Sequence, residues 1–229
     1  MKGKVVLVTG ANGGLGVHVT TAFLNAGATV VGTSRAIQQT DSGQPNFTGI
    51  PADISSLTSA RNLVAQVVHS FGRLDVLAHT VGGFAGGQAL ADTDDATWNR
   101  MLDMNLHSTF HILRATLPML KKARSARIIA IGSRAAVDPG PNVAAYSASK
   151  AAMVSLIRTV ALENKDAGLT ANVILPGTID TPANRAAMPK ADYTQWVQPS
   201  NIASLMVWLA SDPAQDVNGA VIPVYGAGL

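Results

Sequence analysis

The sequence contains no cysteine, few aromatic residues (5%) and few charged ones (14%). The lack of cysteine excludes disulfides, thiolate metal ligands and cysteine nucleophiles. It also fits a reducing compartment, so we expect a cytoplasmic protein. Ordinary globular domains carry about 25% charged residues, whereas here hydrophobic residues make up 47% of the chain. This balance excludes a disordered chain and indicates a surface that other subunits partly cover.

Long hydrophobic runs are missing as well. The longest, such as residues 203–210, fall far short of the ~20 residues that a membrane-spanning helix needs. The apolar start of the chain is broken at Thr9 and Gly10, which predicts a buried first strand rather than a signal peptide. The net charge is only +3, and the one basic cluster, residues 121–127, indicates a solvated helix end. We expect neither a membrane nor a nucleic acid as a partner.

Strand-like and helix-like segments alternate along the whole chain. Aliphatic, β-branched runs predict strands at residues 5–8, 29–32, 47–51, 74–80, 127–131, 170–175 and 220–224. Apolar spacing predicts helices at residues 14–26, 55–71, 96–120, 145–165 and 201–210. Residues 38–46 form a polar loop, and residues 182–199 are irregular and rich in proline. The alternation predicts one α/β domain over residues 1–229, in which helices cover both faces of a doubly wound, seven-stranded parallel sheet.

The loop after the first predicted strand is rich in glycine and leads directly into a predicted helix. It reads Thr-Gly-Ala-Asn-Gly-Gly-Leu-Gly over residues 9–16. Gly10 permits a tight turn, Gly14 lets the backbone approach a pyrophosphate, and Gly16 lets helix and strand pack closely. The start of the helix supplies free N–H groups for phosphates. The loop therefore predicts a dinucleotide site formed by Gly10, Asn12, Gly13, Gly14, Leu15 and Gly16.

The end of the second predicted strand bears on which dinucleotide binds. An acidic residue there binds the ribose 2′-hydroxyl of NAD, whereas an arginine accommodates the 2′-phosphate of NADP. The sequence has Arg35 at this point and no acidic residue between Lys4 and Asp41. A guanidinium is a planar, permanently charged donor that pairs well with phosphate. We therefore expect NADP(H) to be favoured over NAD(H).

Four further residues form a candidate catalytic group. Tyr146 and Lys150 are four residues apart, on one face of a predicted helix. The pKa of a free tyrosine is about 10, and a nearby ammonium lowers it towards the range of a general acid or base. Ser133 follows the fifth predicted strand, thirteen residues before Tyr146. Asn105 stands among apolar residues of a predicted helix, where a buried amide needs partners.

These motifs together resemble the short-chain dehydrogenase/reductase family, and the resemblance covers nearly the whole chain. The glycine loop has the family spacing Thr-Gly-x-x-x-Gly-x-Gly, and Ser133 precedes Tyr146 by the family's thirteen residues. The resemblance is to 3-oxoacyl-reductase-like members. It implies a Rossmann fold and an NAD(P)-dependent enzyme that interconverts a ketone and a secondary alcohol. It also implies that Tyr146 exchanges the proton, Ser133 holds the carbonyl oxygen, and Asn105 holds a water of the proton relay.

The same resemblance implies further contacts to the cofactor. Asp53 would contact the adenine, although a helix N-cap region describes this residue nearly as well. Lys150 would bind the nicotinamide ribose, and Thr181 would hydrogen-bond the nicotinamide carboxamide. The contacts expected beyond the glycine loop are Arg35, Asp53, Ile54, Val81, Gly82, Tyr146, Lys150, Pro176, Gly177, Ile179 and Thr181.

The sequence departs from the family after the fourth predicted strand. Where the family usually has Asn-Asn-Ala-Gly, residues 79–82 read His-Thr-Val-Gly. We expect the backbone of this loop to keep its cofactor contacts, and His79 to be a structural hydrogen-bonding residue. The five histidines include no pair with an acidic neighbour in ligand register, so we expect no metal.

Two other activities remain as alternatives. Residues 82–87 and 180–196 look like the corresponding regions of dihydropteridine reductases, which would make a quinonoid dihydropterin the substrate. Ser133 and the missing NAD-selecting acid favour a carbonyl substrate instead. A non-catalytic protein that senses NADP(H) is the third hypothesis, and the presence of both Tyr146 and Lys150 argues against it.

The assembly is also predicted. The family resemblance implies a homodimer or homotetramer. Residues 145–165 leave only a thin polar face for a surface helix. The tail at 221–229 is apolar to its last residue, so burial across a symmetric interface would protect it.

Overall fold

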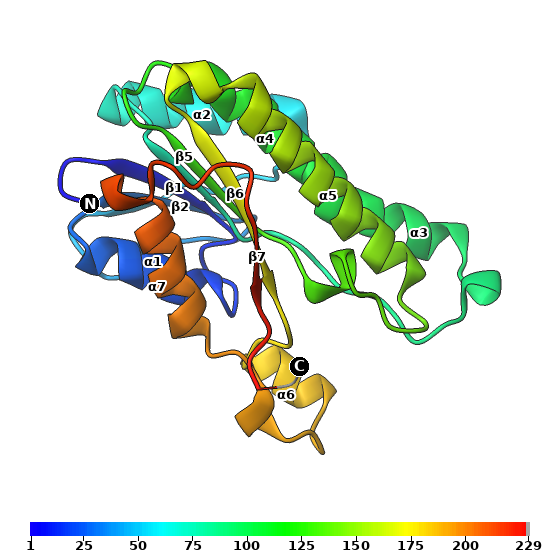
Figure 1. Cartoon of the computed structure of the whole chain (residues 1–229). Coiled ribbons are helices and arrows are strands. Elements are labelled where there is room, and N and C mark those ends of the chain that lie inside the picture. Colours follow the sequence, from blue (N-terminus) through cyan, green and yellow to red (C-terminus); the bar gives the residue numbers. More distant parts are fainter. Residues whose placement is uncertain (228–229) are drawn as a thin grey trace.

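Seven parallel strands form the centre of the computed structural model, which describes residues 1–227 (Figure 1). Their spatial order is β3-β2-β1-β4-β5-β6-β7. The chain builds one half of the sheet outward from β1, crosses back to β4 and builds the other half. This is the predicted doubly wound α/β topology. The strands are β1 (Val5–Thr9), β2 (Thr29–Thr33), β3 (Phe47–Gly49), β4 (Val76–His79), β5 (Arg127–Ile131), β6 (Thr170–Pro176) and β7 (Val221–Val224).

Helices cover both faces of this sheet (Figure 1). They are α1 (Gly16–Asn25), α2 (Leu57–Phe71), α3 (Asp95–Leu102), α4 (Ser108–Leu120), α5 (Ala144–Glu163), α6 (Pro182–Ala187) and α7 (Pro199–Leu209). Helices α2, α4 and α5 pack on one face, and α1 and α7 pack together on the other. Helix α6 lies apart from both layers, beyond the end of β6 (Figure 1). No helix within residues 1–227 is long and apolar enough to cross a membrane.

Alternating residues of the strands supply one apolar core on each face. On β1, Val5 and Leu7 belong to the core under α2, α4 and α5, whereas Val6 and Val8 belong to the core under α1 and α7. Successive side chains of a strand point to opposite faces, so a strand that is covered twice reads as a continuous apolar run. The two cores fix the strands, and the strands in turn fix the loops at their carboxyl ends.

The largest departure from the predicted elements lies at residues 96–120, where one helix was expected. Helix α3 ends at Leu102, a π-helical turn follows at Asp103–His107, and α4 continues from Ser108. A π turn inserts an extra residue into a helix and is frequent at functional sites. It places the polar Asn105 in the interior, 0% exposed. The apolar spacing on either side hides such an insertion.

Two segments without periodic pattern also contain short helices. Residues 182–199, expected to be irregular, hold α6, a 3-10 turn at Tyr193–Gln195 and the start of α7. Helix α6 begins there because Thr181 caps it and a proline occupies its first turn. The polar loop at 38–46 contains a 3-10 turn, Gln39–Asp41.

Candidate active site

A cavity of about 440 Å³ runs along the carboxyl ends of β1 to β4. The loops that follow these strands line it, together with the π turn between α3 and α4. Its position agrees with the rule that ligands of open α/β sheets bind beyond the carboxyl ends of the strands. The lining includes eleven of the predicted cofactor residues, namely Gly10, Asn12, Gly13, Gly14, Leu15, Gly16, Arg35, Asp53, Ile54, Val81 and Gly82.

The glycine loop forms a cradle that side chains would fill. Gly10 has a left-handed φ of +72°, and a Cβ there would lie 2.9 Å from Thr80 Oγ1. A Cβ on Gly16 would collide with the carbonyl oxygen of Gly10. No side chain within residues 1–227 caps the first turn of α1. The N–H groups of Val17 and His18 donate to the carbonyl oxygens of Gly13 and Leu15, and the positive end of the helix dipole points to the cavity. The geometry fits the diphosphate of a dinucleotide.

Arg35 and Asp53 line the same cavity from the ends of β2 and β3, and both side chains are exposed. A hydrogen bond from the Ser55 backbone lowers the pKa of Asp53, assisted by the Ser55 side chain and the charge of Arg35. The Asp53 carboxylate accepts from the Ser55 N–H at 3.0 Å, so Asp53 lies in the N-cap region of α2 without being the N-cap residue. The N-cap of α2 is Ser56, whose hydroxyl accepts from the Ser59 N–H.

Asp41 is a residue near the cofactor cavity that the sequence did not reveal. Its carboxylate accepts from the Gln38 N–H at 3.0 Å and lies 3.5 Å from Asn12 Nδ2, in the glycine loop. The 3-10 turn at the start of the polar loop brings it there. Strand β2 thus has no acidic residue at its end, but the fold brings the acidic Asp41 next to the glycine loop.

The residues after β6 lie beside the glycine loop, although none of them is among the residues that line the cavity. A Cβ on Gly14 would lie 3.0 Å from the Thr181 side chain, so Thr181 borders the glycine loop. The Thr181 hydroxyl accepts from the Asn184 N–H at 3.3 Å, and Asn184 Nδ2 donates to the Ile179 carbonyl oxygen at 2.8 Å. Gly177 N–H donates to Val224 of β7. Pro176, the last residue of β6, and the three residues predicted after it therefore lie on one ordered turn leading into α6.

Asn105 clamps the loop that follows β4. Its Oδ1 accepts from the Gly83 N–H at 2.9 Å, and its Nδ2 donates to the Gly83 carbonyl oxygen at 3.0 Å and to Ser149 Oγ at 3.0 Å. A buried amide is satisfied by such a set. The side chain is thereby committed to holding the loop and α5 together. Ser149, three residues after Tyr146, was not among the predicted residues.

Lys150 lies against the same loop. Its side chain is buried, and Nζ donates to the carbonyl oxygen of Ile131 at 3.0 Å. A Cβ on Gly82 would lie 2.8 Å from Lys150 Nζ and 2.9 Å from Asn105 Oδ1. Burial lowers the pKa of Lys150 to about 8. Lys150 and Asn105 therefore meet at Gly82, which itself lines the dinucleotide cavity.

Tyr146 precedes Lys150 by one turn of α5, with Ser133 beside it after β5. Burial raises the pKa of the Tyr146 phenol, and a hydrogen bond with the Ser133 side chain acts in the opposite direction. The net lowering of this pKa that we expected is not found, because the effect of burial is the larger one. The Lys150 ammonium donates to the Ile131 carbonyl oxygen. The hydroxyl of Ser133 accepts from the Ala135 N–H at 3.2 Å.

His79 is part of a buried hydrogen-bond chain. Nδ1 lies 2.7 Å from Thr9 Oγ1, and Nε2 lies 2.9 Å from Thr109 Oγ1, which donates to the carbonyl oxygen of Asn105 at 2.7 Å. Nε2 is therefore the protonated nitrogen, and Nδ1 accepts from Thr9. Burial, with the charge of Lys150, lowers the pKa of His79 to about 3. This neutral ring links β1 to the π turn, a structural role of the kind that we expected.

Phe84 borders the catalytic group on the outside. It is 67% exposed, and its ring meets the ring of Tyr146 edge-on with the centroids 4.9 Å apart. Residues 82–87 carry it, and Gly87 N–H fixes this loop to the carbonyl oxygen of Asn142 at 2.8 Å. An exposed aromatic ring beside a candidate proton donor offers an apolar surface to a substrate.

Comparison with known proteins identifies the family. Residues 4–192 match the short chain dehydrogenase family. The chain belongs to this family. It is therefore an NAD(P)-dependent oxidoreductase that acts on carbonyl or alcohol groups, and a purely sensory role is set aside.

Similar proteins span the whole chain. A 3-oxoacyl-[acyl-carrier-protein] reductase, FabG, of Thermotoga maritima is 27% identical over 241 residues, which cover 99% of this chain and 98% of the relative. The RhlG/NADP active-site complex of Pseudomonas aeruginosa has a TM-score of 0.90 at 29% identity and covers 100% of this chain and 96% of that one. A 3-ketoacyl-(acyl-carrier-protein) reductase from Brucella melitensis, complexed with NADH, has a TM-score of 0.90 at 25% identity, with 99% and 98% covered. Family members of this fold thus bind either nicotinamide cofactor.

Proposed function

We propose that the protein transfers a hydride between NADP(H) and a ketone or secondary alcohol, with Tyr146 as the general acid or base. One observation carries the proposal: Lys150 and Asn105 converge on Gly82, which lines the dinucleotide cavity. Tyr146 stands one helical turn away from Lys150. If the diphosphate binds the glycine loop, the nicotinamide lies at the Gly82 end of the cavity. Tyr146, which exchanges the proton, would then be near the reacting part of the cofactor.

Each residue of the catalytic group has its own task in this mechanism. The bound cofactor supplies or accepts the hydride. In the direction of reduction, Tyr146 donates its phenolic proton to the carbonyl oxygen, and the Ser133 hydroxyl donates a hydrogen bond to the same oxygen and polarises the carbonyl group. Lys150, protonated below its pKa of about 8, stabilises the phenolate that the proton transfer leaves.

Asn105 acts by positioning the loop after β4. Its three side-chain hydrogen bonds hold Gly83 and Ser149, and therefore fix the backbone of residues 81–83 against the cofactor. The proton is returned to Tyr146 by way of the Lys150 ammonium, which lies beside Asn105 at Gly82. The water that the family resemblance assigns to Asn105 belongs to this path.

The preference for NADP(H) rests on Arg35. Its exposed guanidinium lines the cavity at the end of β2. In this class of fold, a side chain at that point contacts the ribose 2′ position of the cofactor. The nearby Asp41 carboxylate accepts from the Gln38 N–H and lies 3.5 Å from Asn12 Nδ2. Kd values for NADPH and NADH, measured by titration of the intrinsic fluorescence, test this preference directly. Tighter binding of NADH would contradict it.

The substrate that we favour is a ketone with an apolar substituent, such as a β-keto thioester. The FabG relative of Thermotoga maritima acts on 3-oxoacyl groups by name, and the exposed Phe84 ring beside Tyr146 provides an apolar contact. The second candidate is a quinonoid dihydropterin, because residues 180–196 resemble the corresponding region of dihydropteridine reductases. In that segment Arg185 binds the Asp180 carboxylate and packs on the Tyr193 ring, and Gln198, just beyond the segment, binds the same carboxylate.

A side-by-side activity screen tests the proposed function. β-Keto thioesters, diketones and quinonoid dihydropterin are each offered with NADPH, and the loss of NADPH absorbance is followed. We expect turnover with a ketone that is abolished in Tyr146→Phe. Turnover with the dihydropterin alone would select the second candidate. Turnover that survives in Tyr146→Phe would contradict the assigned mechanism.

We also propose that the chain assembles as a homodimer or homotetramer. Phe110 on α4 and Leu162 on α5 are 39% and 73% exposed although apolar, and both helices run along the outer surface in Figure 1. The last two residues of the apolar tail, 228–229, lie outside the described part of the chain. Light scattering behind a sizing column measures the assembly, and a stable monomer at micromolar concentration would contradict it.

A further inference from the structure

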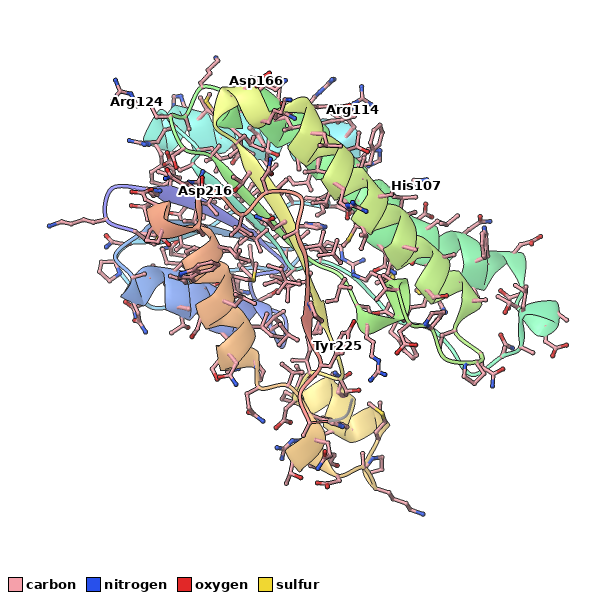
Figure 2. All side chains as sticks on the ribbon, in the orientation of Figure 1. His107, Arg114, Arg124, Asp166, Asp216 and Tyr225 are labelled. Carbon is pink, nitrogen blue, oxygen red and sulfur yellow. The ribbon has the colours of Figure 1, made fainter. Side chains whose placement is uncertain are left out.

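A second cavity, of about 260 Å³, lies at the amino ends of β5 and β6, whereas the candidate active site lies at the carboxyl ends of the strands. Arg127 and Thr170, which line it, are the first residues of β5 and β6 and are paired in the sheet. The catalytic loops follow the other ends of these strands, and the seven residues of β6 span about 20 Å. Figure 2 shows Arg124 and Asp216, both from the cavity lining, at one end of the molecule and Tyr225 towards the other.

Arg127 brings a buried charge to this cavity. Its side chain is only 2% exposed. Nη1 donates to the carbonyl oxygens of Ala126 at 2.9 Å and Gly168 at 3.4 Å. Nε is buried and has no hydrogen-bond partner among residues 1–227. The side of the guanidinium that carries Nε is one of the edges that pair with carboxylate or phosphate oxygens.

No carboxylate in the described part of the chain forms a salt bridge with Arg127. Asp212 acts on its charge from a distance, but that carboxylate is bound by Lys4 at 3.0 Å. Burial lowers the pKa of Arg127, and a guanidinium nevertheless keeps its proton. Buried charges in proteins are normally paired, so this one lacks its counter-ion.

The other residues around the cavity add to the positive charge. Arg124 and Lys165 also line it, and neither forms an ion pair within residues 1–227. The Thr170 hydroxyl is buried with no hydrogen-bond partner in the same residues. Asp216 is the one carboxylate among residues 1–227 that lines the cavity. Three cationic residues and one anionic residue thus line the cavity.

We propose that this cavity is a binding site for a phosphate group, held by Arg127, Arg124 and Lys165. A phosphate in the cavity compensates the charge of the buried Arg127 guanidinium and of the neighbouring Arg124 and Lys165. The volume exceeds the ~30 Å³ share of a single water several-fold. The group comes either from free inorganic phosphate or from an organic phosphate monoester. Because the site lies away from the catalytic loops, it stabilises the fold at the start of β5 and β6 without entering the reaction.

Thermal unfolding with increasing inorganic phosphate tests the proposal. The full chain is saturated with NADP⁺, so that phosphate cannot act through Arg35, and chloride keeps the ionic strength constant. We expect the midpoint temperature to rise along a saturable curve, because a ligand that binds the folded state stabilises it. Arg124→Gln should weaken the apparent affinity by about tenfold, and Asp216→Asn should strengthen it by about threefold.

Lys122→Gln is the matched control, because it removes the same charge from an exposed residue of the basic cluster that does not line the cavity. Its phosphate curve should coincide with that of the unchanged protein. A midpoint temperature that does not respond to phosphate, or one that responds equally in all variants, would overturn the proposal. The cavity would then hold only water. A parallel titration with glycerol 3-phosphate separates the sources of the group: tighter binding than inorganic phosphate assigns the site to an organic phosphate, and weaker binding assigns it to the free ion.

Discussion

Strand β5 has a buried cation at each end. At its carboxyl end, Lys150 is 4% exposed and donates to the carbonyl oxygen of Ile131, the last residue of the strand. At its amino end, Arg127 is 2% exposed and donates to the carbonyl oxygens of Ala126 and Gly168. Neither cation forms a salt bridge with a carboxylate within residues 1–227. The two ends are therefore alike in burial and in their carbonyl partners.

The two cations differ in what burial does to their protons. Burial lowers the pKa of Lys150 from 10.5 to about 8, so this group titrates not far above neutral pH. Burial also lowers the pKa of Arg127, but a guanidinium stays charged in proteins. The same environment thus makes the lysine a partner for proton exchange and the arginine a fixed charge that only an anion compensates.

Lys150→Met should have the largest effect of the substitutions at these buried cations. We expect turnover to fall by about a thousandfold, because the phenolate of Tyr146 loses its stabilising charge. The free energy of unfolding at pH 7 should rise by about 2 kcal/mol, because removing a buried charge relieves more than the lost hydrogen bond contributed. Steady-state kinetics and urea unfolding measure the two effects. A variant that loses both activity and stability would show that Lys150 is mainly structural.

The free energy of unfolding should depend on pH because of Lys150, and its pKa values give the direction. The folded pKa of Lys150, about 8, lies below the unfolded value of 10.5, so the unfolded chain binds more protons between these values. The destabilisation caused by burying the charged Lys150 is fully present below pH 8, and it is relieved as the pH rises towards 10.5. The stability of the unchanged protein should therefore approach that of Lys150→Met over this range. Arg127→Met serves as the comparison, and its pH profile over the same range should parallel that of the unchanged protein.

His79 extends the comparison to a third buried base, next to Lys150. Its pKa is about 3 in the folded chain, against 6.5 when unfolded. The unfolded chain therefore takes up a proton first, and stability falls as the pH drops below 6.5. Between pH 7 and pH 5 we expect a loss of about 2 kcal/mol from this residue. In His79→Asn this part of the loss should be absent, and an unchanged profile would show that His79 is not held neutral.

Arg35 is the exposed counterpart of Arg127, and its replacement should have a smaller effect. Arg35→Asp should shift the ratio of kcat/KM for NADPH over NADH towards NADH by about tenfold or more, because a carboxylate repels the 2′-phosphate and accepts from a 2′-hydroxyl. Asp41→Asn should move the ratio slightly the other way, since it removes a negative charge beside the glycine loop. An unchanged ratio in Arg35→Asp would mean that Arg35 does not contact the cofactor.

The sequence predicted the strands and the glycine loop well because their signals are local. Val5–Thr9 reads as a doubly covered strand, and the glycines after it have roles that only backbone geometry imposes. The π turn at Asp103–His107 was missed because one inserted residue leaves the flanking apolar spacing intact. Asp41 and the unpaired Arg127 depend on contacts between segments far apart in the chain. Such contacts have no periodic signature.

Tyr146→Phe tests the central claim, that the carboxyl edge of the sheet carries out hydride transfer with Tyr146 as the proton donor. The substitution keeps the ring that packs against Phe84 and removes only the hydroxyl. We predict that the Kd for NADPH changes by less than about twofold, while kcat with a ketone substrate falls by at least about a hundredfold. Fluorescence titration and steady-state kinetics on the same preparation measure both. A kcat close to that of the unchanged protein, with cofactor binding intact, would contradict the role of Tyr146 as the proton donor.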